Sequence, residues 1–123
     1  MTRYKTRKVK SIDRDGYGWG NGYIRIPKGH KWYGLDYQYI DKKYKGNEPI
    51  TYARFEKNGE FWIGFDTCHY IKGTVNTIQD EKFVDRELRL LVVVAKFNIG
   101  VIRQQKLKET IKELIVYLKN TNK

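Results

Sequence analysis

The densest group of reactive side chains in this sequence is the run Asp66-Thr67-Cys68-His69. Carboxylate, thiolate and imidazole groups are the usual metal ligands and the usual partners in nucleophilic catalysis. The chain has only one other histidine, His30. His30, Asp66 and His69 could form a small hydrolase or metal-dependent site with the histidines as general acid and base. Such a site requires the loop around His30 to form one pocket with the strand end at Asp66, and we expect that arrangement.

Other features of the sequence favour a protein that is not an enzyme. The chain has a single cysteine, whereas structural zinc sites normally show paired ligand motifs. It contains no G-x-S-x-G, Walker lysine loop, H-E-x-x-H or C-x-x-C motif, and the G-x-G-x-G run at residues 18–22 lacks the dinucleotide-binding spacing. We therefore favour structural roles for Cys68 and His69 and expect neither a metal nor a cofactor. The enzyme stays open as an alternative.

A second chemical signal is the interleaving of aromatic and basic residues over positions 19–45. Aromatic rings stack on bases while lysine and arginine hold phosphates, so this mixture is typical of a nucleotide or single-strand site. The same rings are also needed for the core, because Leu35 is the only leucine before Leu88. The expected ligand-binding residues are Lys28, His30, Lys31, Trp32, Tyr33, Asp36, Tyr37, Trp62, Asp66 and His69.

The charge of the chain indicates the class of its partner. Lys and Arg outnumber Asp and Glu by 25 to 14, which gives a net charge of +11. Such a field attracts nucleic acid, nucleotides or an acidic protein complex, although basic charge can also serve solubility alone. Residues 1–10 contain no acidic residue, and we expect them to form a flexible arm along phosphates. The basic residues of this arm are Arg3, Lys5, Arg7, Lys8 and Lys10.

Composition predicts one folded domain over residues 11–123. Hydrophobic residues make up 40% of the chain and aromatic residues 15%, which is enough for a core that needs no disulfide or structural metal ion. A lone cysteine and the lack of a signal-peptide pattern predict the reducing cytoplasm. The longest apolar run, residues 90–95, is far shorter than the ~20 residues that cross a bilayer, so we expect no membrane association.

The expected fold class is α+β, with a small antiparallel sheet packed by a C-terminal amphipathic helix. Two strand-like segments flank Lys57-Asn58-Gly59 and predict a hairpin over residues 50–67. Residues 80–97 suit either a buried helix or a central strand, and we favour the helix. A helix over about residues 103–119 follows from apolar residues that share one face, namely Leu107, Ile111, Leu114, Ile115 and Leu118.

Two segments carry a resemblance to known sequences. Residues 27–37 read P-K-G-H-K-W-Y-G-L-D-Y and residues 64–69 read G-F-D-T-C-H. Residues 22–70 as a whole resemble a set of small phage-encoded proteins of unassigned function, in which such segments precede a C-terminal helix. Members often carry His-Gly-Gly before the first hairpin strand, where this chain has Glu48-Pro49-Ile50, so no shared catalytic histidine is expected there. The resemblance implies a viral accessory protein in a host bacterial cytoplasm.

The leading hypothesis is therefore a non-enzymatic phage accessory protein that binds an anionic partner. That partner is a nucleic acid, a nucleotide signal or a nucleic-acid-handling host defence complex, and in the last case the protein acts as a counter-defence inhibitor. Two alternatives remain: a small hydrolase using His30, Asp66 and His69, and an oligomeric structural or interaction module. The sequence leaves the ligand and the oligomeric state open.

Overall fold

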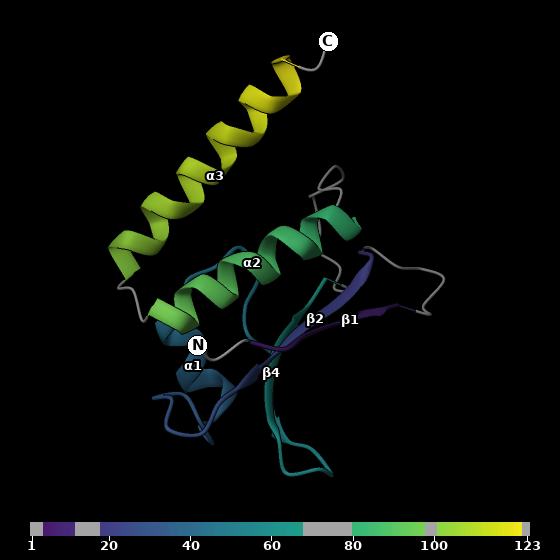
Figure 1. The fold of residues 1–123 in the computed structure, drawn as a ribbon, viewed down its shortest axis with the longest axis vertical. Coiled ribbons are helices and arrows are strands. Elements are labelled where there is room, and N and C mark those ends of the chain that lie inside the picture. The colour runs from purple at the N-terminus through teal and green to yellow at the C-terminus, as the bar shows by residue number, and fades with distance from the viewer. Residues whose placement is uncertain (1–3, 12–17, 68–79, 98–100, 122–123) are drawn as a thin grey trace.

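The chain folds into a four-stranded sheet and three helices, the α+β class that the sequence predicts (Figure 1). The computed structural model describes residues 4–11, 18–67, 80–97 and 101–121. In chain order the elements are β1 (Thr6–Lys10), β2 (Gly20–Ile26), α1 (Tyr37–Lys43), β3 (Tyr52–Phe55), β4 (Phe61–Asp66), α2 (Glu81–Phe97) and α3 (Val101–Thr121).

The sheet has the strand order β1-β2-β4-β3, and every neighbouring pair is antiparallel. The predicted hairpin is confirmed as β3 and β4. Its turn is closed by the Glu56 N–H, which donates to the Glu60 carbonyl at 2.8 Å. Gly59 has a φ of 82°, a left-handed conformation that favours glycine. The hairpin therefore follows from local turn chemistry.

The free arm expected over residues 1–10 is wrong for residues 6–10, because β1 pairs with β2 from Thr6 to Lys10. Neighbouring side chains of this edge strand reach carboxylates on opposite sides. Arg7 bonds Glu56, whereas Lys8 bonds Glu81 at the start of α2. Backbone pairing and ion pairs together fix a segment whose charge alone predicts an extended, mobile chain. Arg3 lies outside the described residues.

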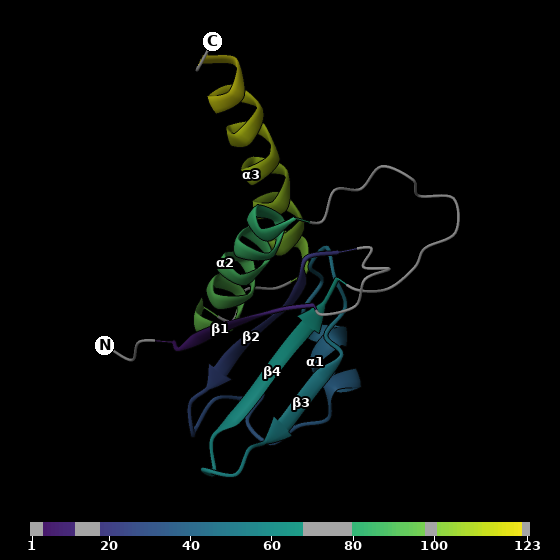
Figure 2. The same ribbon diagram turned by 90° about the vertical axis from the view of Figure 1, so that its right-hand side faces the viewer.

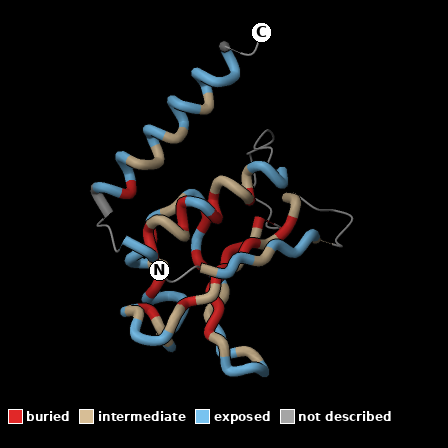
Figure 3. Tube along the Cα trace, viewed as in Figure 1, coloured by how far each residue is buried: buried red, intermediate tan, exposed pale blue. Residues whose placement is uncertain are grey.

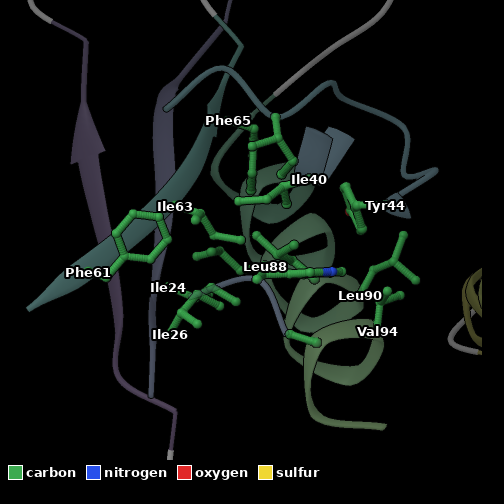
Figure 4. Packing of buried hydrophobic residues seen from close by; sticks show 14 of the residues in the cluster. Ile24, Ile26, Ile40, Tyr44, Phe61, Ile63, Phe65, Leu88, Leu90 and Val94 are labelled. Carbon is green, nitrogen blue, oxygen red and sulfur yellow. The ribbon is translucent and has the colours of Figure 1, made fainter. Parts of the chain in front are cut away.

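One face of the sheet packs against α2 and forms the core (Figure 4). Ile24 and Ile63 from the central strands and Leu91 from α2 are all fully buried. Gly22 permits the close approach of the helix, since a Cβ there would lie 2.9 Å from Cγ of Leu88. The favoured helix over residues 80–97 is thus confirmed. Its Leu and Val residues serve helix burial in spite of their fit to a strand.

The helix that covers the sheet is α2, whereas the sequence assigns that role to the helix over residues 103–119. The predicted helix lies within α3, but α3 extends away from the sheet beyond its first turns (Figures 1 and 3). Leu114 is 55% exposed and Leu118 is 49% exposed. The more strongly amphipathic α2 already fills the apolar face of the sheet. Within the described residues, no helix has the length and apolarity needed to span a bilayer.

A buried carboxylate ties α2 to the segment after α1. Glu87 is 1% exposed, and its Oε1 accepts from the Tyr44 hydroxyl at 2.5 Å and from the Asn47 and Glu48 backbone N–H groups at 2.9 and 3.2 Å. Burial, followed by the charge of Glu87, raises the pKa of Tyr44 well above its usual value. Tyr44 therefore stays a donor, and the buried charge has its hydrogen-bond partners.

A buried amide ties α3 to the end of α1. The Gln104 side chain accepts from the Lys45 N–H and donates to the Lys43 carbonyl, both at 2.7 Å. Gln104 is fully buried, so these bonds fix the base of α3 against the end of α1. Neither Glu87 nor Gln104 shows a sequence signal that distinguishes it from the other polar residues of its helix.

Candidate nucleic-acid interface

The loop that carries His30 supports the core. The Trp32 N–H donates to His30 Nδ1 at 2.9 Å, so Nε2 carries the proton and donates to the Ala95 carbonyl at 2.7 Å. Trp32 is 4% exposed, and its ring lies against that of His30. Both imidazole nitrogens are therefore engaged, Nδ1 within the loop and Nε2 in the bond that joins the loop to α2, and the Trp32 ring is buried in the core.

The remaining loop residues have structural or exposed positions. The Asp36 side chain accepts from the Gln38 N–H and caps α1. Tyr33 packs edge-on against Phe55, with 5.4 Å between ring centroids. The expected ligand-binding residues Lys28, Lys31 and Tyr37 are exposed. The P-K-G-H segment thus folds as a turn before a capped helix.

His30 and Asp66 lie at opposite ends of the sheet, so the expected shared pocket is wrong. Ile26, which precedes the His30 loop, pairs with Phe61, whereas Asp66 pairs with Asn21. These two pairs are five residues apart along β2, or about 17 Å. Antiparallel pairing of β2 with β4 imposes this separation.

The other members of the predicted catalytic group offer no alternative centre. Cys68 and His69 lie outside the described residues. Asp66 accepts a hydrogen bond from the Thr51 hydroxyl at 3.0 Å. Across the ranges that the structure describes, no group of three or more His, Cys, Asp and Glu side chains could hold a metal ion. The geometry gives no support to a hydrolase built on His30 and Asp66.

A different cluster forms on the face of the sheet away from α2, here called the open face. The strands turn this face toward the viewer in Figure 2. Arg25 of β2 and Arg54 of β3 are both register partners of Trp62 on β4. Lys5 extends the same row, because its carbonyl accepts from the Arg25 N–H. Trp62 and three basic residues, drawn from four places in the chain, thus lie in one row.

A second row runs parallel to the first. Arg7 pairs with Tyr23, and Gly64 lies between Tyr23 and Tyr52. A Cβ on Gly64 would lie 2.3 Å from Cδ1 of Tyr23, so the glycine gives that ring its place on the sheet. The Tyr23 and Tyr52 rings meet edge to face with 5.1 Å between centroids. The two tyrosines therefore form an aromatic pair at the centre of the open face.

Cations lie over these rings. The Arg7 guanidinium is 4.3 Å from the Trp62 ring centroid and 4.9 Å from that of Tyr23. Arg54 lies 5.6 Å from the Tyr52 ring centroid. Trp62 is consequently only 6% exposed, while Arg54 is exposed and Tyr52 is half-buried. Trp62 thus lies buried beneath the cluster, and Arg54 and Tyr52 are the members of the cluster that solvent can reach.

Two carboxylates orient the cations. Glu56 accepts two bonds from Arg7 at 3.0 and 2.5 Å, and Glu60 accepts from Arg25 at 2.6 Å and Lys5 at 3.5 Å. The hydrogen bond from Arg7 lowers the pKa of Glu56, and that from Arg25 lowers the pKa of Glu60 to about 2. Both are therefore ionised at neutral pH. The set still has four cations and two carboxylates, a net +2; its members are Lys5, Arg7, Arg25, Arg54, Glu56 and Glu60.

Sequence reasoning identified one central member of this face, Trp62, and assigned Lys5 and Arg7 to an arm. Tyr23 and Arg25 were recognised only as members of the aromatic-basic interleaving over positions 19–45, and Tyr52 and Arg54 were missed. The available signal was the alternation within the strands, since Arg25 lies between two buried isoleucines. Comparison of the chain with protein-family models, curated proteins and solved structures finds no match.

Proposed function

We propose that the protein binds single-stranded nucleic acid on the open face of its sheet. The observation that carries this proposal is the row in which Arg25 and Arg54 flank Trp62, next to the aromatic pair Tyr23 and Tyr52. Sheets with exposed aromatic and basic residues suit this task because bases lie flat on rings while cations hold the backbone.

Some of the accessible groups suit the bases of a nucleic acid, and others suit its phosphates. Tyr52 and the planar guanidinium of Arg54 offer stacking surfaces to bases, each worth ~1 to 3 kcal/mol for an aromatic ring. Arg7 and Arg25 already make charge-assisted bonds to carboxylates, and phosphate oxygens present a similar acceptor geometry. When a single-stranded nucleic acid binds here, its phosphates would replace Glu56 and Glu60 as the hydrogen-bond acceptors of these arginines.

Single strands fit this face better than duplexes do. A duplex hides its base surfaces in the helix stack, where the rings of the open face cannot reach them. A non-enzymatic role in a host bacterial cytoplasm, as the resemblance to phage-encoded proteins implies, accords with such binding. A nucleotide signal and a host defence complex are the other anionic partners, and neither requires affinity for a single strand.

The test is fluorescence anisotropy with a labelled single strand of about eight nucleotides. Binding should weaken steeply from about 50 to about 300 mM salt as counterion release loses its advantage. Arg54→Gln should weaken it about tenfold and lower the salt slope by about one, because both a stacking surface and a cation are lost.

Lys112→Gln is the matched control, since it removes one exposed positive charge from α3, remote from the open face (Figure 1). It should change affinity by less than about twofold. Equal losses in the two variants would show that net charge alone drives binding. Saturable binding of free nucleotides with no affinity for the strand would replace the proposal with a nucleotide site.

A further inference from the structure

The free end of α3 carries an apolar surface that the described residues leave uncovered. Residues 114–118 read L-I-V-Y-L, five consecutive apolar residues. Val116 is 57% exposed and Tyr117 is 63% exposed. Helices that are apolar around their circumference are normally buried. This surface therefore differs from scattered exposed hydrophobic residues and indicates an interface.

The apolar residues of α3 follow a heptad pattern. Leu107, Ile111, Leu114 and Leu118 are spaced by four, three and four residues, the a and d spacing of a coiled coil. Gln104 continues the pattern toward the base, where it is buried against the body. The seam of α3 is defined here as Leu107, Ile111, Leu114 and Leu118. Val116 lies outside it.

We propose that α3 pairs with α3 of a second copy of this chain in an antiparallel two-fold arrangement. In that register Leu107 meets Leu118 of the second copy and Ile111 meets its Leu114, and the two-fold axis repeats both contacts. The result is four apolar layers from one self-complementary surface. Nucleic-acid binding on the open face does not depend on this interface.

The charges beside the seam favour the antiparallel orientation over the parallel one. Parallel pairing would bring Arg103 of one helix beside Lys108 of the other, two cations at flanking positions of the seam. Antiparallel pairing instead places Lys108 beside Ile115 and Thr110 beside Tyr117 of the second copy. No like-charged pair then borders the apolar layers, and the lysine stem adds apolar contact.

The base of α3 offers a place for the tip of its partner. A groove between α2 and α3 is lined by the apolar residues Val93, Phe97 and Leu107 together with Arg103, Lys106 and Thr110. Phe97 is 63% exposed. The antiparallel register carries Leu118 of the second copy to Leu107, at this groove. Tip and groove therefore cover each other's exposed apolar surface, and both are repeated by the two-fold axis.

Self-association through α3 and nucleic-acid binding on the open face should depend on salt in opposite ways. Two copies that each carry +11 repel one another, and salt screens that repulsion. Apolar burial is not weakened by moderate salt. Self-association should therefore strengthen from about 50 to about 300 mM salt, whereas strand binding should weaken over the same range.

The experiment is sedimentation equilibrium of the full chain at about 100 µM, above the dissociation constant of an ordinary specific interface. The wild type should sediment at twice the monomer mass of 14.7 kDa. Leu114→Asp should be a monomer, and at concentrations low enough to dissociate the wild type the two proteins should share one melting temperature, because Leu114 is 55% exposed within a single copy. Val116→Asp is the matched control, since this side chain is similarly exposed and outside the seam, and it should remain dimeric.

Spin labels at Lys119→Cys, in a Cys68→Ser background, test the orientation. Antiparallel helices should place the labels about 22 Å apart, and parallel helices about 10 Å apart. A wild type that is monomeric at both salt concentrations overturns the proposal. So does equal loss of the dimer in the two Asp variants, which would indicate non-specific adhesion of the apolar tip.

Discussion

The two faces of β4 show how one strand serves two purposes. Phe61, Ile63 and Phe65 point into the core beneath α2 and are at most 2% exposed. On the other face, Trp62 is buried by the guanidinium of Arg7, and Gly64 leaves room for the Tyr23 ring. Neighbouring residues of one strand are thus selected by different forces, apolar burial on one face and charge with aromatic contact on the other.

The energies of these forces differ. Full burial of a large apolar side chain contributes ~1.5 to 3 kcal/mol, whereas a solvent-exposed ion pair contributes ~0.2 to 1 kcal/mol. The covered face therefore holds the fold together. The open face contributes less to stability, so its cations can change partners at little cost. Substitutions on the two faces should accordingly separate stability from binding.

The largest effect on stability is expected on the covered face. Leu91→Ala removes a fully buried side chain from α2 and should lower the unfolding free energy by ~2 to 5 kcal/mol in urea denaturation. The affinity of the folded fraction for a single strand should not change. Loss of affinity without loss of stability would contradict the division between the faces.

A somewhat smaller loss is expected at the buried carboxylate. Glu87→Gln puts an amide among four donors, those of Tyr44, Glu48 and both Asn47 groups, so at least one N–H loses its acceptor. The expected cost is ~1 to 3 kcal/mol. Glu81→Gln, an exposed position on the same helix, should cost less than ~1 kcal/mol by the same urea measurement.

Gly64→Ala should affect both the stability of the fold and the affinity for single-stranded nucleic acid. The new Cβ would displace the Tyr23 ring and disturb its contact with Tyr52. Overpacking of this kind costs ~1 to 3 kcal/mol. Strand affinity should fall together with stability. Unchanged affinity would show that the aromatic pair takes no part in binding.

The smallest expected effect is a pH dependence on the open face. Because the folded pKa of Glu60 is about 2 against an ordinary 4.5, its ion pairs stabilise the fold above pH 4.5 and lose that effect as the pH falls toward 2. Glu60→Gln should flatten urea stability over this window. It should also tighten strand binding at neutral pH, because Arg25 and Lys5 lose a competing anion. Weaker binding would mean that Glu60 mainly positions these cations.

Local patterns predicted the elements of the fold well. The Lys57-Asn58-Gly59 turn defines the hairpin by itself, and helical spacing defines α3, whereas over residues 80–97 the pattern favoured a helix but also suited a strand. The assignment of α3 to the sheet failed because periodicity identifies an apolar face and says nothing about what covers it. The same limit applies to β1, where the pairing with β2 depends on residues distant in sequence.

The candidate site was harder to predict. Trp62 was among the expected ligand-binding residues, but Arg25 and Arg54 join it only through the register of three strands. Proximity in the sequence suggested a loop site around His30, whose ring instead bonds Trp32 and Ala95. Sites built across a sheet carry no contiguous motif, so pairing must be known before they become visible.

The most direct test uses two of the three tryptophans of the chain, Trp62 and Trp32. Trp62 lies under the open face and Trp32 lies in the core on the other side, so their indole N–H signals in a ¹H–¹⁵N NMR spectrum report on the two faces separately. Addition of a single-stranded oligonucleotide should shift the Trp62 signal and leave that of Trp32 in place. A shift confined to Trp32, or saturable binding that moves neither signal, would contradict a nucleic-acid site on the open face.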